Sequence, residues 1–243
     1  MKLFVTDTYE AMSKQAADEV IRLMESFDKP LICTASGDSP AGIYKEINRR
    51  VLKKELDTRN WFFVGLDEWV GMNGKDEGSC RFHLDQELFH PLQVAGEKIC
   101  FFDGRVKDLE LECRQVENFI RQQGGIDVAI LGLGMNGHLG MNEPGTPAAL
   151  RSHIAALDPV TQKVGQKYFK NQQALSQGIT LGLATIMEAR HIILLVSGRH
   201  KAEIVQQVLE SDISELLPAT ILRKHPAVKM FLDGEAASKM IQF

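Results

Sequence analysis

The chain has 243 residues, of which 44% are hydrophobic and 25% are charged, and its formal net charge is −4 at pH 7. This length and balance suit a single domain over residues 1–243 with a core of ordinary size, which needs neither a disulfide nor a structural metal to fold. A weakly acidic chain without a basic run is atypical of proteins that bind nucleic acid, although it leaves room for a local basic pocket that holds a small anion.

The amino-terminal residues MKLFVTDTYEAMSKQ contain a run of only three apolar residues, Leu3 to Val5, before polar and acidic residues follow. A secretory signal peptide needs a longer apolar stretch, and no run in the chain approaches the roughly 20 residues of a membrane span. Four cysteines lie at spacings that fit neither a metal site nor a redox motif: Cys33, Cys80, Cys100 and Cys113. We therefore expect a cytoplasmic protein with reduced thiols and no membrane partner.

Apolar runs of strand length alternate along the chain with stretches of helical length. The runs that predict strands cover residues 30–34, 61–66, 99–102, 126–131, 191–196 and 228–232. The helical stretches cover residues 9–26, 41–54, 109–123, 181–189 and 200–210. Continuous rather than alternating apolarity is typical of strands buried on both faces. The order therefore predicts an α/β three-layer sandwich with a mostly parallel central sheet, in which a ligand binds at the carboxyl ends of the strands.

The segment after the first predicted strand, residues 35–40, reads Ala-Ser-Gly-Asp-Ser-Pro and leads into a predicted helix. Small residues and a proline at a helix start leave backbone N–H groups free, and the helix dipole adds positive potential, so this loop is suited to a phosphate. The alternative is an ordinary tight turn in which Ser39 caps the helix and Pro40 is its first residue. Asp38 would repel a phosphate unless its side chain points away.

Two adjacent carboxylates, Asp67 and Glu68, follow the strand predicted at residues 61–66. In an extended segment their side chains face opposite sides, so we expect only one of them to enter a cleft. Partial burial there would raise the pKa of that carboxyl and suit it to act as a base. The alternative is a pair of solvated loop acids.

The stretch after the fourth predicted strand is the richest in glycine and reads GLGMNGHLGMNEPG from Gly132 to Gly145. It contains the spacing G-x-G-x-x-G, with Asp158 about twenty residues further on, which is the pattern of dinucleotide-binding folds. That fingerprint requires its third glycine to open a helix, whereas Gly140 and Pro144 would break a helix within two turns. These helix-breaking residues therefore argue against a dinucleotide site.

A loop of this kind suits catalysis because glycines let the backbone approach a substrate closely. His138 lies five residues before Glu143, and a carboxylate on the same irregular loop can orient an imidazole that shuttles a proton. A lone histidine is more often an ordinary surface or core residue, but Asn136 and Asn142 bring the polar side chains on this loop to four. This density favours a functional loop. The chain has no H-E-x-x-H motif and no Cys/His cluster, which argues against a metal site.

The strand predicted at residues 191–196 is followed by Ser-Gly-Arg-His-Lys, residues 197–201, and then by a predicted helix. Basic residues at a helix N-terminus oppose the helix dipole, and a bound anion would offset that repulsion. Lys201 is therefore a candidate partner for a phosphate. A solvated basic turn is the alternative.

At these residues the chain resembles the glucosamine-6-phosphate deaminase/isomerase family. Five motifs carry the resemblance in the family's order: S-G-x-S-P at 36–40, G-L-D-E at 65–68, the block at 132–145, I-T-L-G at 179–182 and S-G-x-x-K at 197–201. They span most of the chain, and the block at 132–145 is highly specific. The resemblance implies a Rossmann-like three-layer sandwich. The same superfamily includes 6-phosphogluconolactonases, which lack an N-E-P segment after the histidine.

Finer features resemble the galactosamine-6-phosphate branch of the family. Glucosamine enzymes commonly carry tyrosine at the position of Trp69. Three further segments point the same way: 138–140 (His-Leu-Gly), 153–158 (His-Ile to Leu-Asp) and 217–219 (Leu-Pro-Ala). The resemblance therefore favours galactosamine 6-phosphate as substrate over glucosamine 6-phosphate.

The chain also departs from the family's pattern. Asp38 stands where the phosphate loop usually has glycine, and Asn136 stands where some members carry aspartate. His153 and Ala155 occupy the places of basic residues that allosteric members use just beyond N-E-P. The resemblance therefore does not support regulation by an amino sugar.

The resemblance implies an enzyme that opens the ring of a 2-amino-2-deoxyhexose 6-phosphate, moves a proton between C2 and C1, and hydrolyses the resulting imine to ketohexose 6-phosphate and ammonia. It assigns ring opening to His138, supported by Glu143 and Asn136, and the proton transfer to Asp67. It assigns the substrate phosphate to Ser36, Gly37, Ser39, Lys201 and Lys167. No cofactor and no metal is implied, because the proton transfer is internal and the nitrogen leaves as ammonia.

Three other functions stay open on the sequence. They are a sugar-phosphate lactonase, a nicotinamide-dependent oxidoreductase and a non-catalytic sugar-phosphate sensor. The presence of Asp67, His138 and Glu143 weighs against the sensor, which would not need them. The sequence leaves open the stereochemistry of the substrate at C4 and whether the chain assembles into a homo-oligomer.

Overall fold

The computed structural model describes residues 1–240, and within them seven parallel strands form one sheet. In spatial order the strands are β1 (Lys2–Thr6), β10 (Val228–Asp233), β9 (His191–Val196), β6 (Val128–Gly132), β2 (Leu31–Thr34), β3 (Phe62–Gly65) and β5 (Ile99–Cys100). All six strands predicted from apolar runs are present. β1 was not predicted, because its apolar run is short and it pairs only with β10 at the edge of the sheet.

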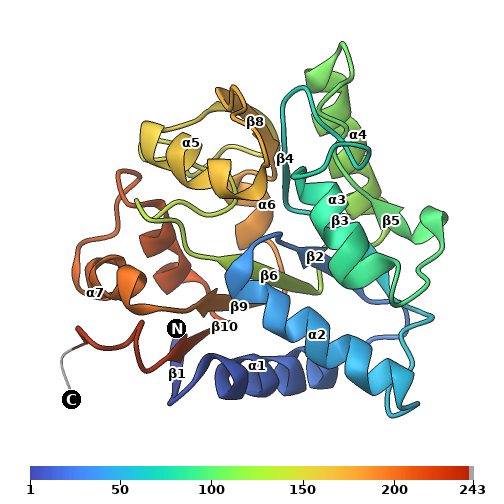
Figure 1. Cartoon of the computed structure of the whole chain (residues 1–243), viewed down its shortest axis with the longest axis horizontal. Helices are drawn as coiled ribbons and strands as arrows, with labels where there is room; N and C mark the ends of the chain where they lie inside the picture. The colour runs from blue at the N-terminus through green and yellow to red at the C-terminus, as the bar shows by residue number, and fades with distance from the viewer. Residues whose placement is uncertain (241–243) are drawn as a thin grey trace.

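Helices cover both faces of this sheet (Figure 1). α1 (Tyr9–Met24) and α2 (Asp38–Leu52) pack on one face, where their apolar residues meet side chains such as Ile32 of β2 and Ile193 of β9. α4 (Leu109–Gln122), α6 (Leu183–Met187) and α7 (Ala202–Glu210) pack on the other face, against neighbours such as Cys33 and Leu194. Successive strand residues thus enter opposite cores, as side chains in a strand must. The predicted α/β three-layer sandwich is confirmed.

A second sheet of three antiparallel strands, which was not predicted, stands beside the first among the described residues. It consists of β4 (Asp67–Trp69), β8 (Gln177–Thr180) and β7 (His153–Ala156). The Leu66 N–H donates to the Thr34 carbonyl at the end of β2, and the Leu181 N–H donates to the Leu66 carbonyl. These bonds fix the second sheet at the carboxyl end of the first, where a ligand is expected.

Short helices accompany the second sheet. They are α3 (Cys80–Leu84), which continues into the helical turns of η1 (Asp85–Phe89), and α5 (Pro159–Gly165), which continues into η3 (Gln166–Tyr168). A small separate core under them includes Trp69, Met141 and Leu157. In residues 1–240 no helix combines the length and apolarity that crossing a lipid bilayer would require.

Candidate active site

The loops that follow β2, β6 and β9 meet at the carboxyl edge of the parallel sheet. The hydroxyls of Ser39 and Ser197 lie 3.1 Å apart, which joins the start of α2 to the end of β9. The Lys201 Nζ donates to the Leu133 carbonyl at 2.6 Å, which joins the segment after β9 to the end of β6. Three loops far apart in the sequence therefore form one surface.

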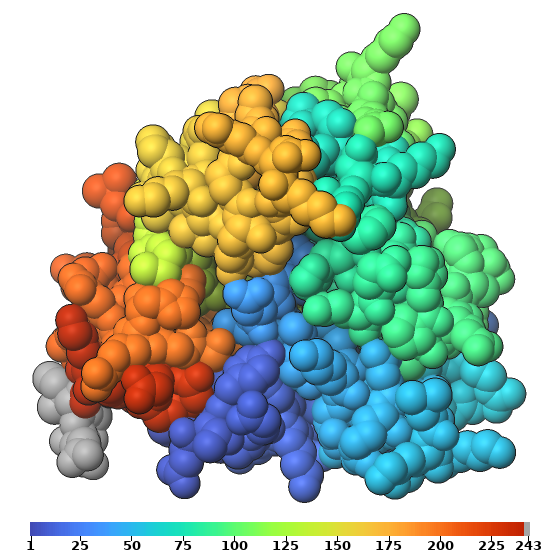
Figure 2. Space-filling model, viewed as in Figure 1, coloured from blue at the N-terminus to red at the C-terminus, as the bar shows by residue number. Residues whose placement is uncertain are grey.

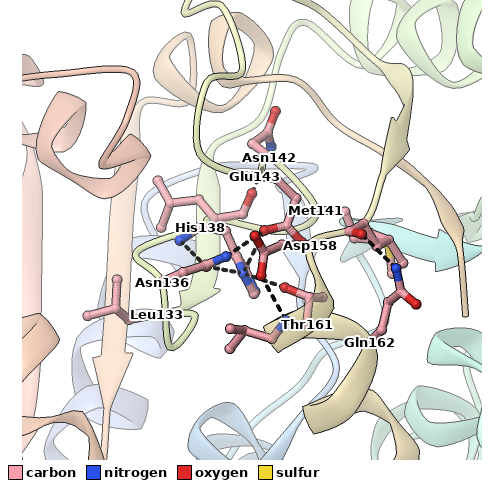
Figure 3. A network of polar contacts seen from close by, with 12 residues as sticks. Leu133, Asn136, His138, Met141, Asn142, Glu143, Asp158, Thr161 and Gln162 are labelled. Atoms are coloured by element: carbon pink, nitrogen blue, oxygen red, sulfur yellow. Dashed lines mark hydrogen bonds and ion pairs between the residues drawn. The ribbon is translucent and has the colours of Figure 1, made fainter.

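The glycine-rich loop after β6 holds a hydrogen-bonded cluster of side chains (Figure 3). The Asn136 amide Nδ2 donates to Glu143 Oε2 at 2.8 Å, and the Asn136 Oδ1 lies 2.7 Å from His138 Nδ1. Glu143 Oε2 is itself 3.5 Å from His138 Nδ1. Burial acts to raise the pKa of Glu143, but the hydrogen bond and charge of His138 and the bonds from Thr161 and Asn136 outweigh it and lower that pKa. Glu143 is therefore held as a carboxylate beside the imidazole.

This cluster defines the tautomer of the neutral imidazole. A carboxylate can only accept, so Asn136 must turn its NH₂ toward Glu143 and its carbonyl oxygen toward His138. That oxygen can only accept, so His138 Nδ1 must carry the hydrogen. The lone pair then lies on Nε2, which is free to take a proton, and the imidazolium that results is stabilised by Glu143.

Two glycines of the same loop make room for His138 and Asp67. A methyl group added at Gly134 would fall 2.4 Å from the His138 ring, so the imidazole lies directly on the Gly134 backbone. Gly140 has φ +59°, and a methyl group added there would fall 2.8 Å from Thr180 Oγ1 and 3.4 Å from Asp67 Oδ2. The loop therefore approaches both the imidazole and the carboxylate more closely than a larger residue would allow.

Asp67 and Glu68 face opposite sides of β4, as expected. Asp67 is 8% exposed, and burial raises its pKa to about 6 although the Cys80 thiol and the His138 charge act to lower it. Glu68 is fully buried on the other side and accepts the backbone N–H groups of Trp69, Cys80 and Arg81 at 2.8–3.0 Å. Glu68 therefore fixes the start of α3, and Asp67 is the carboxylate available on the side of His138.

The predicted phosphate loop begins α2 without a side-chain cap. Gly37 is the residue before the helix and has φ +120°, and no side chain bonds the first N–H groups of the helix. Helix α2 starts at Asp38, so Ser39 and Pro40 lie inside its first turn and the alternative in which Ser39 caps the helix is wrong. The Tyr9 hydroxyl donates to the Asp38 carbonyl at 2.6 Å and accepts the Gly42 N–H at 2.8 Å, which anchors this turn to α1. Free N–H groups at a helix start suit an anion.

Two lysines lie beside this loop. Burial, aided by the nearby charge of Lys167, lowers the pKa of Lys201 to about 8. Lys167 in η3 pairs with Asp38, Nζ to Oδ2 at 2.5 Å, so the carboxylate that the sequence places in the loop is turned toward a cation. Burial and the charges of Asp67 and Glu68 raise the pKa of the Cys80 thiol, which bonds Asp67, and a hydrogen bond with Ser36, next to Gly37, acts against this shift. The structure thus brings the residues predicted for the phosphate to one place, beside the predicted catalytic groups.

Some residues of the site were not predicted from the sequence. Thr161 of α5 has its hydroxyl 3.1 Å from His138 Nδ1, and the Tyr168 hydroxyl would lie 3.2 Å from a methyl group at Gly37. Both come from the segment over the second sheet, whose sequence carries no strong apolar period to place it. Ser197 belongs to the S-G-x-x-K motif, but no role in the site is predicted for it from the sequence.

Asp158, the acid that would complete a dinucleotide fingerprint, has another role. Its side chain accepts the Val160 N–H at 2.7 Å and caps α5. The glycine-rich loop continues from Gly132 without opening a helix. Among residues 1–240 no three His, Cys, Asp or Glu side chains gather as a metal site would need.

The chain is similar in sequence and in fold to several known proteins. A sequence model for "Glucosamine-6-phosphate isomerases/6-phosphogluconolactonase" matches residues 6–231. A protein of Shouchella clausii named glucosamine-6-phosphate deaminase is 37% identical over 243 residues, which cover 100% of this chain and 98% of the relative. The solved structure of a monomeric glucosamine-6-phosphate deaminase superposes with a TM-score of 0.95 at 34% identity, covering 98% of this chain and 100% of that one. A 6-phosphogluconolactonase from Trypanosoma brucei shares the fold at a TM-score of 0.77 and 21% identity, with 99% and 98% coverage.

Proposed function

Because the chain belongs to the family of glucosamine-6-phosphate isomerases and 6-phosphogluconolactonases, we propose that it converts a 2-amino-2-deoxyhexose 6-phosphate to the ketohexose 6-phosphate and ammonia. One observation carries the proposal. The carboxylate of Asp67 and the His138–Glu143 pair lie together, and Lys201 and Lys167 lie beside the start of α2 at the same edge of the sheet. This arrangement suits a sugar that carries its reacting carbons and its phosphate at opposite ends.

In the proposed reaction His138 opens the pyranose ring. Its Nε2 lone pair takes the proton of the O1 hydroxyl and delivers a proton to O5, while Glu143 stabilises the imidazolium between the two transfers. Asn136 keeps the hydrogen on Nδ1 throughout, because its amide is fixed by Glu143. The imidazole therefore ends the step in the tautomer in which it began.

Asp67 then moves a proton from C2 to C1 of the open-chain substrate. A carboxylate with a pKa of about 6 is ionised at neutral pH and is a stronger base than an exposed aspartate. As this proton moves, the aldehyde oxygen O1 gains a proton and the nitrogen loses one, so C1 becomes a CH₂OH group and C2 carries an imine. Water then adds to the imine carbon, and the nitrogen leaves as ammonia to give the ketone. Contacts to the distant phosphate by Ser36, Gly37, Ser39, Lys201 and Lys167 would hold C1 and C2 in place for these steps.

The epimer of the substrate is the finer part of the proposal. The relatives named above are glucosamine-6-phosphate deaminases, which favours glucosamine 6-phosphate. Trp69 and Leu139 favour galactosamine 6-phosphate by their resemblance to that branch, but both are buried, at 5% and 0% exposed. They would influence the orientation of the C4 hydroxyl only through the groups that they support. We therefore propose both hexosamine phosphates as substrates to be compared.

The test is ammonia release by the purified protein from glucosamine 6-phosphate and, separately, galactosamine 6-phosphate. We expect ammonia from at least one of them, and the ratio of the two kcat/KM values identifies the epimer. Hydrolysis of 6-phosphogluconolactone is measured in parallel, because a lactonase shares the fold. Lactone hydrolysis without ammonia, or binding of either amino sugar without turnover, would reject the proposed function.

A further inference from the structure

A carboxylate side chain, that of Asp38, lies in the predicted phosphate loop. Asp38 is the first residue of α2, and its carboxylate Oδ2 lies 2.5 Å from the Nζ of Lys167. The two side chains come from segments 129 residues apart in the sequence. Figure 2 shows the gold segment that carries Lys167 lying against the blue segment that begins α2. The ion pair therefore joins η3, which accompanies the second sheet, to the predicted phosphate loop.

Asp38 stands among cations. Lys201 approaches the same place, and the charge of Lys167 acts to lower its pKa while the charge of Asp38 acts to raise it. The charges of Lys201, Lys167 and Asp38 also act on His200. Asp38 thus offsets part of the positive charge at this end of the site, and Asp233 also acts on His200. Its side chain is 71% exposed, and that of Lys167 is 45% exposed, so the pair can separate at small cost.

A phosphate bound at the start of α2 would need the same cation. Lys167 reaches Asp38 at the first residue of the helix, next to the N–H groups that carry no side-chain cap. A dianion placed there brings two negative charges to the side of Asp38, and like charges at contact distances repel. The lysine can hold the phosphate fully only when it gives up the carboxylate.

We propose that Asp38 is a built-in counter-ion of the phosphate subsite, which occupies Lys167 in the free protein and gives it up when a phosphate enters. The inference rests on the proposed function for the identity of the substrate but not for the measurement. Its consequence is that Asp38 weakens the binding of a phosphate group and sets the affinity of the site for sugar phosphates. It also lowers the affinity of the site for inorganic phosphate.

The substitution Asp38→Asn removes the charge and keeps the shape of the side chain. Because one unit charge near the surface is worth a factor of a few in affinity, we expect inorganic phosphate to bind about three- to tenfold more tightly to this variant than to the wild type. The matched control is Asp57→Asn, which removes the carboxylate of another exposed ion pair, with Arg59 at 2.6 Å. Asp57 follows the opposite end of α2, so this variant should leave phosphate affinity unchanged.

The measurement is isothermal titration of inorganic phosphate into wild type, both single variants, Lys167→Met and the double variant Asp38→Asn/Lys167→Met. We expect Asp38→Asn to tighten binding, and we expect its effect to shrink in the Lys167→Met background because the contested cation is gone. Unchanged or weaker binding by Asp38→Asn would overturn the inference, since the carboxylate would then be neutral or would position Lys167 for the phosphate. An undiminished effect in the double variant would also overturn it. Titration requires no turnover, so a protein that releases no ammonia would reject the proposed function and leave this result standing.

Discussion

Replacement of Asp67 by asparagine should greatly slow turnover and stabilise the protein at the same time. Asp67 is 8% exposed, and burial raises its pKa to about 6 from the usual 3.8. A raised pKa means that folding disfavours the charged form, which is the form that the proposed proton transfer needs. Asparagine has nearly the same shape but carries no charge, so it removes both the base and the cost of burying it.

The size of the stability change follows from the two pKa values. Their difference corresponds to about 3 kcal/mol at about 1.4 kcal/mol for each tenfold change in proton affinity. The native protein holds this proton at pH values where the unfolded chain has released it. The contribution is therefore fully present below about pH 3.8 and is lost as the pH rises through 6. Because asparagine also changes the bond with the Cys80 thiol, we expect Asp67→Asn to gain about 1–3 kcal/mol at pH 7.5 and little at pH 4.

Urea unfolding of both proteins at pH 4 and pH 7.5 measures this difference, and ammonia release measures turnover. Loss of a general base should lower kcat by about 10²- to 10⁴-fold, and kcat/KM of the wild type should fall tenfold per pH unit below about pH 6. Asp127→Asn is the control, because that buried carboxylate accepts the Leu31 N–H at 2.8 Å and pairs with Arg190 at 3.1 Å. It should lose stability at pH 7.5. An Asp67→Asn variant that is less stable than wild type at pH 7.5, or that keeps a near wild-type rate, would refute the reasoning.

Two further substitutions probe the phosphate end and the catalytic loop. Lys201→Ala should raise KM about tenfold or more with little loss of stability. The KM of the wild type should rise as the pH passes about 8, where Lys201 loses its proton. Unchanged kinetics of the variant would exclude Lys201 as a phosphate ligand. Gly137 has φ +80°, and a methyl group there would fall 2.2 Å from Leu217 Cδ1, so Gly137→Ala should lower the unfolding free energy by about 2–3 kcal/mol. Gly145→Ala, with φ +90° and open space around the added methyl, should lose only the backbone part, and equal losses in urea unfolding would contradict the clash.

The parallel sheet was predictable because its central strands are buried on both faces. Such strands must be apolar throughout, and runs like the one that forms β9 stand out in any reading of the sequence. The second sheet was not predictable in the same way. β4 is three residues long and consists of Asp67, Glu68 and Trp69, so its extended form comes from pairing with β8 rather than from its own composition. Tertiary contacts determine whether such short segments form strands.

The site residues likewise fall into two groups: those that their local sequence predicts, and those that only tertiary contacts bring into the site. Asn136, His138 and Glu143 share one glycine-rich loop, so their spacing alone predicts that they belong to a functional site. Thr161 reaches the imidazole from a helix capped by Asp158, and nothing in its own neighbourhood distinguishes it from a surface threonine. A residue whose partner lies on another element shows its role only when the fold has placed the two together.

Both ends of the site hold a charge that folding disfavours. At one end burial works against the ionised form of Asp67, and at the other burial and Lys167 work against the protonated form of Lys201. A sugar phosphate would relieve the second cost directly, because its dianion returns the pKa of Lys201 toward the ordinary value for lysine and makes the ion pair with Asp38 unnecessary. In the proposed reaction, the free energy released at the phosphate end would hold the sugar against Asp67, a carboxylate that burial has made more basic. In the proposed reaction, phosphate binding and proton transfer would therefore be carried out by different residues, so that binding is strengthened where no bond changes and the base keeps its reactivity where one does.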